Sequence, residues 1–350
     1  TTTWQVSGIW APVRDVRFRA TYSQAVRAPN ISELFAPSSG TFGRVNDPCD
    51  KDNLARGTAY RTANCQTLLA AEGLSADEIA NYDPSSSPTA TGAVAGRTGG
   101  NRDLKEEIAT TWTAGVVIQP RFLPGLMIGV DWYNIVIRDA INTASLQTLV
   151  NLCVDQPSTD NVYCDNVSRD NGTGYVDDFY VAPQNVASYR TRGVDFQANY
   201  RFDLGSIGAV NAKLVGSYLD RLDYVPTPGA VRQNDLLEES APQYSGTFDL
   251  TWTSGPVTLN YGLAYSSKTR RYSEQTLAAE PDIADPDYLY YREKWEHDVQ
   301  ASIAVGTDYT FYVGVNNLTG QIGDVDNSYR PYSYVGRSIY AGARLRLPGL

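Results

Sequence analysis

The sequence has 350 residues, of which 42% are hydrophobic, and its 29 basic and 39 acidic side chains give a formal net charge of −10. A chain this acidic, with no basic patch, argues against a nucleic-acid partner. Its mean hydropathy of −0.34 and the lack of any run of about 18 apolar residues exclude a spanning helix. They leave a spanning β-barrel open, because barrel strands alternate and are only weakly hydrophobic on average. The 24 tyrosines, against a single Met and a single His, are typical of a β protein.

Strands joined alternately by short turns and long loops are predicted along the whole chain. The first begins almost at once, and T-T-T-W-Q-V carries no targeting features, so we expect a piece of a longer protein. The expected strands cover 4–13, 18–27, 108–119, 126–138, 189–202, 209–219, 244–253, 257–266, 297–305, 310–318 and 338–347. The expected turns lie near 14–15, 121–125, 204–208, 254–255 and 306–308. Long polar loops are expected near 30–108, 140–187, 224–242, 270–293 and 320–336.

The faces of these strands separate by polarity. Along 189–202, Val194 and Phe196 oppose Asp195 and Gln197, as period-two alternation requires. A soluble sandwich would alternate in the same way, but its connections have no reason to switch strictly between short and long. Short turns at one end and long loops at the other are typical of outer-membrane barrels. The predicted fold is all-β: an antiparallel transmembrane β-barrel segment of about 11 strands with short periplasmic turns and long extracellular loops.

The second strand should stop at Arg27-Ala28-Pro29, because proline removes a ladder donor and keeps the preceding residue extended. The stretch 27–35, R-A-P-N-I-S-E-L-F, resembles the R-A-P element of TonB-dependent outer-membrane receptors, where a barrel strand leads into an extracellular loop. Residues 101–107 resemble the family segment that returns to the barrel, although both of its prolines are replaced. V-N-N-L at 315–318 also matches, and 337–347 resembles the closing strand with Leu347 in place of the usual aromatic residue.

The resemblance covers residues 1–350 but only the C-terminal half of a receptor. It implies half of a 22-stranded barrel, with the plug domain, the TonB box and the first barrel half absent. The implied function is uptake of a scarce solute, an oligosaccharide, siderophore or similar, at the bacterial outer membrane, with no enzymatic activity and no cofactor. The implied partners are outer-membrane lipid, the solute (a sugar or iron chelate) and the TonB complex acting through the missing plug. The rival hypothesis is a passive porin or adhesin without energy coupling.

All four cysteines lie in the first two long loops, and none lies in an expected strand. In an oxidising compartment each close pair predicts a local disulfide, Cys49 with Cys65 and Cys153 with Cys164. Pairing across the two loops remains an alternative.

Enzymatic constellations are not evident, since one His leaves little scope for a catalytic triad and no phosphate-binding glycine loop opens a helix. His297 is expected in an aromatic girdle, and residues 96–100, G-R-T-G-G, in a flexible linker. The acidic sets Asp47, Asp50, Asp52 and 165–178 are expected to be solvated loops, with a calcium site as the less favoured alternative.

The candidate solute contacts are loop aromatics and one arginine, because aromatic faces suit sugar rings and siderophore catechols alike. They are Arg44, Tyr60, Tyr163, Tyr175, Tyr180, Tyr272, Tyr329 and Tyr332. Each of them could equally pack a loop or belong to a girdle. Long acidic loops slightly favour an oligosaccharide, or another neutral or cationic solute, over an anionic ferric siderophore.

Overall fold

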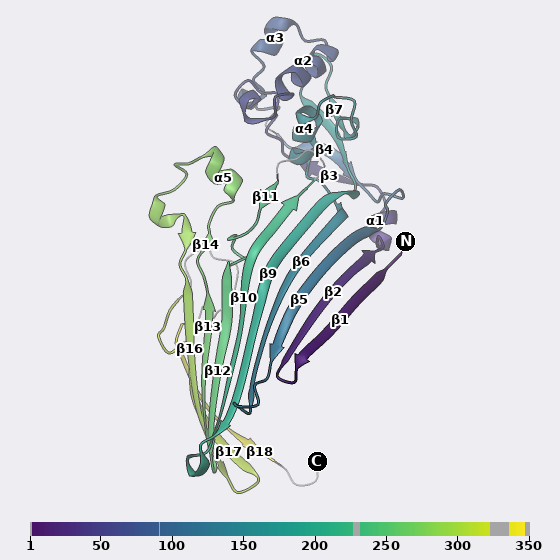
Figure 1. Ribbon diagram of the computed structural model, residues 1–350. Coiled ribbons are helices and arrows are strands. Elements are labelled where there is room, and N and C mark those ends of the chain that lie inside the picture. The colour runs from purple at the N-terminus through teal and green to yellow at the C-terminus, as the bar shows by residue number, and fades with distance from the viewer. Residues whose placement is uncertain (1, 91, 227–231, 323–335, 347–350) are drawn as a thin grey trace.

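The computed structural model describes residues 2–90, 92–226, 232–322 and 336–346. One large curved sheet dominates it (Figure 1), with strands in the order β1-β2-β5-β6-β9-β10-β12-β13-β16-β17-β18, every neighbouring pair antiparallel. The bounds are β1 Trp4–Val13, β2 Val16–Arg27, β5 Glu107–Ile118, β6 Leu126–Asn142, β9 Gln184–Asp203, β10 Ala209–Val225, β12 Tyr244–Ser254, β13 Val257–Ser266, β16 Lys294–Val305, β17 Tyr309–Asn316 and β18 Ser338–Leu345. A short twelfth strand, β11 (Gln233–Asn234), pairs with β10. The predicted meander of about 11 strands is confirmed, although Leu347 lies outside the described residues.

The sheet has one polar and one apolar face, and the register shows which residues share each. Arg19, Gly115, Asp131 and Asp195 are successive ladder partners from β2 to β9, so they lie on one face. Arg19 Nε donates to Asp131 Oδ1 at 2.8 Å, reaching across β5 at Gly115. A Cβ on Gly115 would lie 1.9 Å from that oxygen, so this ion pair requires glycine.

The opposite face carries a row of aromatic side chains towards the long-loop end of the sheet. Its rings contact one another between strands, Tyr22 with Trp112 at 4.1 Å and Tyr265 with Trp295 at 4.2 Å between centroids. We call this the aromatic row: Trp4, Tyr22, Trp112, Trp132, Tyr218, Tyr244, Tyr265 and Trp295. His297 lies two residues from Trp295 on the same face, with Nδ1 2.8 Å from the Tyr261 hydroxyl.

Three central strands are longer than the sequence predicts. β6, β9 and β10 have 17, 20 and 17 residues, whereas about 9–11 residues suffice to cross an apolar layer at a tilt. Their extra length lies at the long-loop end, where they rise towards the folded loops (Figure 1). Apolar and polar residues alternate clearly only in the part of each strand that has one apolar face. The predicted strands therefore cover that part and leave out the extensions at the long-loop end.

β2 ends at Arg27, as predicted from the proline two residues later. Asn30 then caps a short helix, α1 (Ile31–Phe35), in a capping box: its side chain accepts from the Glu33 amide while the Glu33 carboxylate accepts from the Asn30 amide. Glu33 and Glu107 also contact the Arg27 guanidinium, the latter at 2.6 Å. The R-A-P-N-x-x-E sequence therefore ends a strand, begins a helix and ties both to β5.

The first two long loops fold together into one unit above β5, β6 and β9 (Figure 1). We call it the loop domain, residues 39–100 and 143–181. Its sheet has the order β3-β4-β8-β7, in which β4 and β8 are parallel. Its elements are β3 Ser39–Gly43, η1 Leu54–Arg56, α2 Arg61–Ala71, α3 Ala76–Ala80, η2 Pro84–Ser86, β4 Val94–Thr98, α4 Leu146–Asp155, η3 Cys164–Asn166, β7 Val167–Arg169 and β8 Val176–Val181.

The expectation of a flexible linker at 96–100 is wrong. Gly96 lies in β4, and a Cβ there would come within 2.4 Å of the Phe179 ring, so the glycine allows close packing of that ring. The short turn between β9 and β10 carries η4 (Gly205–Ile207), and a later loop carries β14 (Thr269–Arg270), α5 (Glu274–Ala279), η5 (Pro286–Tyr288) and β15 (Tyr290–Tyr291). No helix in the described segments has both the length and the apolar character needed to cross a membrane.

Candidate functional site

A buried ion pair lies at the centre of the loop domain. Arg169 donates to both oxygens of Asp47, from Nη1 at 2.6 Å and from Nη2 at 2.9 Å, and both side chains are about 5% exposed (6% and 4%). The Tyr82 hydroxyl shares its single hydrogen between two acceptors, Asp47 Oδ2 at 3.2 Å and the Gly174 carbonyl at 2.7 Å. The Cys49 backbone amide donates to the other carboxylate oxygen, Asp47 Oδ1, at 2.9 Å. One carboxylate therefore joins segments from both long loops.

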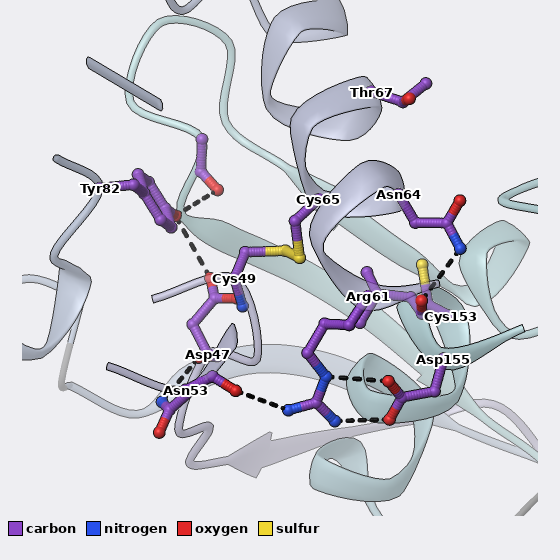
Figure 2. The surroundings of a disulfide bond; sticks show 12 residues. Asp47, Cys49, Asn53, Arg61, Asn64, Cys65, Thr67, Tyr82, Cys153 and Asp155 are labelled. Carbon is purple, nitrogen blue, oxygen red and sulfur yellow. Dashed lines mark hydrogen bonds and ion pairs between the residues drawn. A yellow bond between two sulfur atoms is a disulfide. The ribbon is translucent and has the colours of Figure 1, made fainter. Parts of the chain in front are cut away.

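A second ion pair joins the two main helices of the loop domain. Arg61 at the start of α2 donates through Nε to Asp155 Oδ1 at 2.9 Å, at the end of α4, and through Nη1 to the Asn53 carbonyl at 3.1 Å (Figure 2). The pair is nearly buried, with side-chain exposures of 6% and 14%. Asn64 reinforces the junction by donating to the Val154 carbonyl at 3.0 Å.

The two predicted disulfides are confirmed, each within its own loop. Cys49 bonds to Cys65 on α2, and Cys153 on α4 bonds to Cys164 (Figure 2 shows the first). No free cysteine occurs. Both bonds border one shared apolar core, which contains Leu69, Tyr82, Leu149, Leu152, Val154 and Tyr163. The loops are therefore crosslinked separately, while packing and ion pairs hold them to each other.

The acidic residues at 47–52 are not the solvated loop that composition predicts. Asp47 and Asp50 are buried at 6% and 1% exposure, and only Asp52 is exposed. Asp50 accepts from the backbone amides of Asp52 at 2.9 Å and Ser85 at 3.1 Å, which makes it a structural carboxylate. Among the described residues, no group of three His, Cys, Asp or Glu side chains is arranged to hold a metal ion.

Burial and charge act in opposite directions on the central pair. Burial raises the pKa of Asp47, but the Arg169 guanidinium and the hydrogen bonds from Arg169, Cys49 and Tyr82 outweigh it, so this pKa lies below its ordinary value. Burial and the neighbouring Asp47 charge raise the pKa of Tyr82, which therefore stays a neutral donor.

The loop domain is expected to lose stability in acid because the pKa of Asp47 is depressed in the folded state. A depressed carboxyl stabilises the fold at pH values above its unfolded pKa of about 3.9, and this stabilisation is lost as the pH falls through the folded value. The protection factors of α2 amides, which compare each exchange rate with that of an unfolded chain at the same pH, should therefore be high at neutral pH and fall below about pH 4. An Asp47→Asn variant should show a flatter dependence, whereas an unchanged profile would contradict this role for Asp47.

Two of the candidate contact residues lie beside one cavity of about 390 Å³ in the loop domain. Arg44 and Tyr175 line it together with Asn46, Ser85 and Gln147. The backbone amide of Asn46 donates to Gln147 Oε1 at 2.7 Å, and Gln147 Nε2 donates to the Asn46 carbonyl at 2.9 Å, which fixes this wall. The cavity thus combines an exposed guanidinium, an aromatic ring and oriented amides, a set suited to an oxygen-rich ligand.

The other predicted contact residues do not gather there. Tyr163 is only 5% exposed and belongs to the loop-domain core, whereas Tyr60 is 48% exposed beside α2. The Tyr180 hydroxyl lies 3.4 Å from the Gly100 carbonyl, to which it donates. Tyr272 follows β14 in a different loop. The remaining two, Tyr329 and Tyr332, lie outside the described residues.

Sequence reasoning missed a second surface, on the polar face of the sheet. A hollow of about 510 Å³ lies against β6, β9, β10, β12 and β13, and its polar lining includes Asp131, Asp195, Gln197, Ser217, Ser245 and Thr247. Nearer the loop domain, Tyr189 and Tyr224 stack at 4.7 Å, and Asn142 donates to the Tyr224 hydroxyl at 2.5 Å. Both tyrosines were assigned to or beside strand ends, and only the register places them together.

The chain matches the model of the TonB dependent receptor-like beta-barrel family over residues 1–318. No curated protein matches it. Among solved structures, a ferric enterobactin receptor variant from Pseudomonas aeruginosa in complex with enterobactin has a TM-score of 0.58 and 12% identity over 97% of this chain and 40% of its own. The siderophore receptor PirA from Acinetobacter baumannii has a TM-score of 0.57 and 13% identity, with coverages of 97% and 40%.

The FrpB iron transporter from Neisseria meningitidis has a TM-score of 0.53 and 14% identity, covering 97% of this chain and 38% of its own. At such identities the likeness concerns the fold, and this chain spans about two fifths of the length of each of the three proteins. The sheet order, the R-A-P strand ending and the family match over residues 1–318 agree: the chain belongs to the TonB-dependent receptor-like β-barrel family.

Proposed function

We propose that this chain is the C-terminal part of the barrel of an outer-membrane receptor that takes up a scarce solute with energy supplied through TonB. The observation that carries the proposal is the family match over residues 1–318. A sheet with one apolar face and an aromatic row supports placement in a membrane, because tyrosine and tryptophan favour the membrane interface. The partners in this proposal are membrane lipid, the solute, and a TonB complex acting on a plug domain that these 350 residues do not include.

The proposed solute is neutral and rich in oxygen atoms, such as an oligosaccharide or an uncharged iron chelate. Two arginines on the polar face of β2, Arg19 and Arg27, are ion-paired with carboxylates, which reduces their attraction for an anion. The loop-domain cavity with Arg44 and Tyr175 would receive the solute first. The polar hollow of the sheet, with Asp195 and Ser217, would receive it next.

An uptake assay tests this function. A strain that lacks the receptor is complemented with the natural full-length gene, and uptake of radiolabelled oligosaccharides and iron chelates is compared with and without TonB. The proposal requires uptake of at least one neutral solute that stops when TonB is deleted. Uptake that persists without TonB would favour a passive porin, and no uptake of any solute would favour an adhesin.

The proposed membrane placement also predicts which ends of the strands face outwards: the loop domain lies outside the cell and the short turns lie in the periplasm. Ser86 is exposed in the loop domain and Ser206 is exposed in a short turn, so cysteines at these two positions form a matched pair. A membrane-impermeant maleimide added to intact cells should label Ser86→Cys and leave Ser206→Cys unlabelled until the outer membrane is opened. Labelling of Ser206→Cys alone would invert the proposed topology.

A further inference from the structure

An arginine cluster lies on the apolar face, directly beyond the aromatic row. On β9, Arg192 lies two residues and Arg190 four residues before Val194, on the side nearer the long loops. All three side chains therefore share one face. Arg192 is the ladder partner of Arg221 on β10. Five arginines form this group, which we call the outer arginine cluster: Arg138, Arg190, Arg192, Arg221 and Arg232.

The charges of this cluster are incompletely balanced within the chain. Its ion pairs in the described part of the chain use two carboxylates: Arg192 pairs with Asp220, and Asp223 pairs with Arg221 at 2.6 Å and with Arg232 at 3.2 Å. Five arginines therefore face two ion-paired carboxylates in a chain whose net charge is −10. Arg192 and Arg221 are direct ladder partners, and each of them is ion-paired with one of these two carboxylates.

The two remaining arginines form no ion pair in the described contacts, although Asp223, which pairs with Arg221 and Arg232, is the ladder partner of Arg190. Arg190 donates through Nε to the neutral Asn134 side chain at 3.1 Å. Arg138 is exposed near the end of β6, on the same face as Asn134. Guanidinium groups present several donors in a planar fork that matches phosphate oxygens. Their fixed spacing along β6 and β9 offers a site for a multidentate anion.

An apolar hollow of about 690 Å³ lies below the cluster on the same face. Its floor contains the small residues Gly8, Ala20 and Ala114, and the bulky Trp10, Phe18 and Trp132 border it. Val194 also lines the hollow, and Arg192 lies two residues, about 7 Å, further along the same strand. A cationic group at the interface above an apolar recess complements an anionic lipid, whose headgroup would lie on the cationic group and whose acyl chain would lie in the recess.

We propose that this face binds a phosphate-bearing membrane lipid, with the phosphate on the outer arginine cluster and an acyl chain in the hollow. The site rests on the proposed membrane placement of the sheet. It lies on the face opposite the solute hollow, so it is a separate site. The aromatic row marks the interface depth, where lipid headgroups lie, and the cluster begins one step beyond it. Bound lipid would neutralise the guanidinium groups of Arg138 and Arg190 and hold β6 and β9 at that depth.

Lipid titration followed by native mass spectrometry tests the headgroup. The probes are dimyristoyl phosphatidic acid and dimyristoyl phosphatidylcholine, which share their acyl chains. They are added to the natural full-length protein, purified in detergent. The protein should prefer phosphatidic acid. Arg138→Ala/Arg190→Ala should bind it roughly 30-fold more weakly, because each arginine near a membrane surface contributes roughly fivefold in affinity. Equal affinity for the two lipids would overturn the proposal.

The matched control is Arg17→Ala/Arg201→Ala, which removes two exposed arginines from the polar face of the same sheet. It should bind phosphatidic acid as tightly as the unmodified protein does. An equal loss of affinity in both double variants would mean that overall charge, and not this cluster, determines binding. Inorganic phosphate and glycerol phosphate, which lack acyl chains, should compete poorly. Competition as strong as that of the lipid would show an anion site without a lipid.

The hollow is tested by Ala114→Leu, since Ala114 is exposed and the larger side chain would fill its floor. This variant should weaken phosphatidic acid binding while leaving competition by glycerol phosphate unchanged. Unchanged lipid binding would remove the hollow from the site. Membrane extraction of each variant separates the two proposals: absence from the outer membrane would refute the proposed placement, whereas membrane-inserted protein without lipid preference would refute the lipid site alone.

Discussion

Replacing Asp47 with asparagine is expected to destabilise the loop domain by about 3–5 kcal/mol, because Arg169 would remain buried without a carboxylate to balance its charge. Arg169 is bound by both oxygens of Asp47 and has a side-chain exposure of 6%, so water cannot replace the lost partner without opening the domain. The measurement is amide hydrogen exchange of α2 and α4 in the purified protein, from which the local opening free energy follows.

The matched control is Asp52→Asn, which removes the same charge five residues away from an exposed side chain. It should change the opening free energy by no more than about 0.5 kcal/mol, as is usual for surface substitutions. Similar exchange in the Asp47 and Asp52 variants would mean that the Asp47–Arg169 pair contributes little. The Cys49–Cys65 bond remains in both variants, so the comparison isolates the ion pair from the crosslink.

Expression of these 350 residues alone is expected to give no stable membrane-inserted monomer. In the described part of the chain, β1 pairs only with β2 and β18 only with β17, so both outer edges of the sheet lack a neighbouring strand. Each unsatisfied backbone group in hydrocarbon costs several kcal/mol, and an edge of 10 residues such as β1 presents a row of them.

Outer-membrane fractions from a receptor-deleted strain provide the measurement. The chain alone should aggregate or be degraded, and the natural full-length gene in the same vector should give a heat-modifiable, protease-resistant band. Recovery of such a band from the 350 residues alone, together with energy-dependent uptake, would show that this sheet closes on itself and would refute the need for further strands.

The strand order was predictable because it depends on local properties. Alternation along 189–202 and the proline after Arg27 act within a few residues, and each short turn pairs the two strands that it joins, such as β1 with β2. The disulfide partners followed from spacing for the same reason. One local signal was overlooked, the capping box formed by Asn30 and Glu33, which predicts α1 from sequence alone.

The loop domain and both candidate surfaces depended on contacts between distant residues. Asp47 meets Arg169 across 122 positions and Arg61 meets Asp155 across 94, so composition showed acidic loops where the fold has buried ion pairs. Register across the five strands from β2 to β10 brings Arg19 to Asp131 on one face and Arg192 to Arg221 on the other. The sequence alone determined a membrane-type strand meander and its family, because those follow from local alternation and motifs. Only tertiary packing decided which side chains meet, because a buried charge is stable only where the fold supplies its partner.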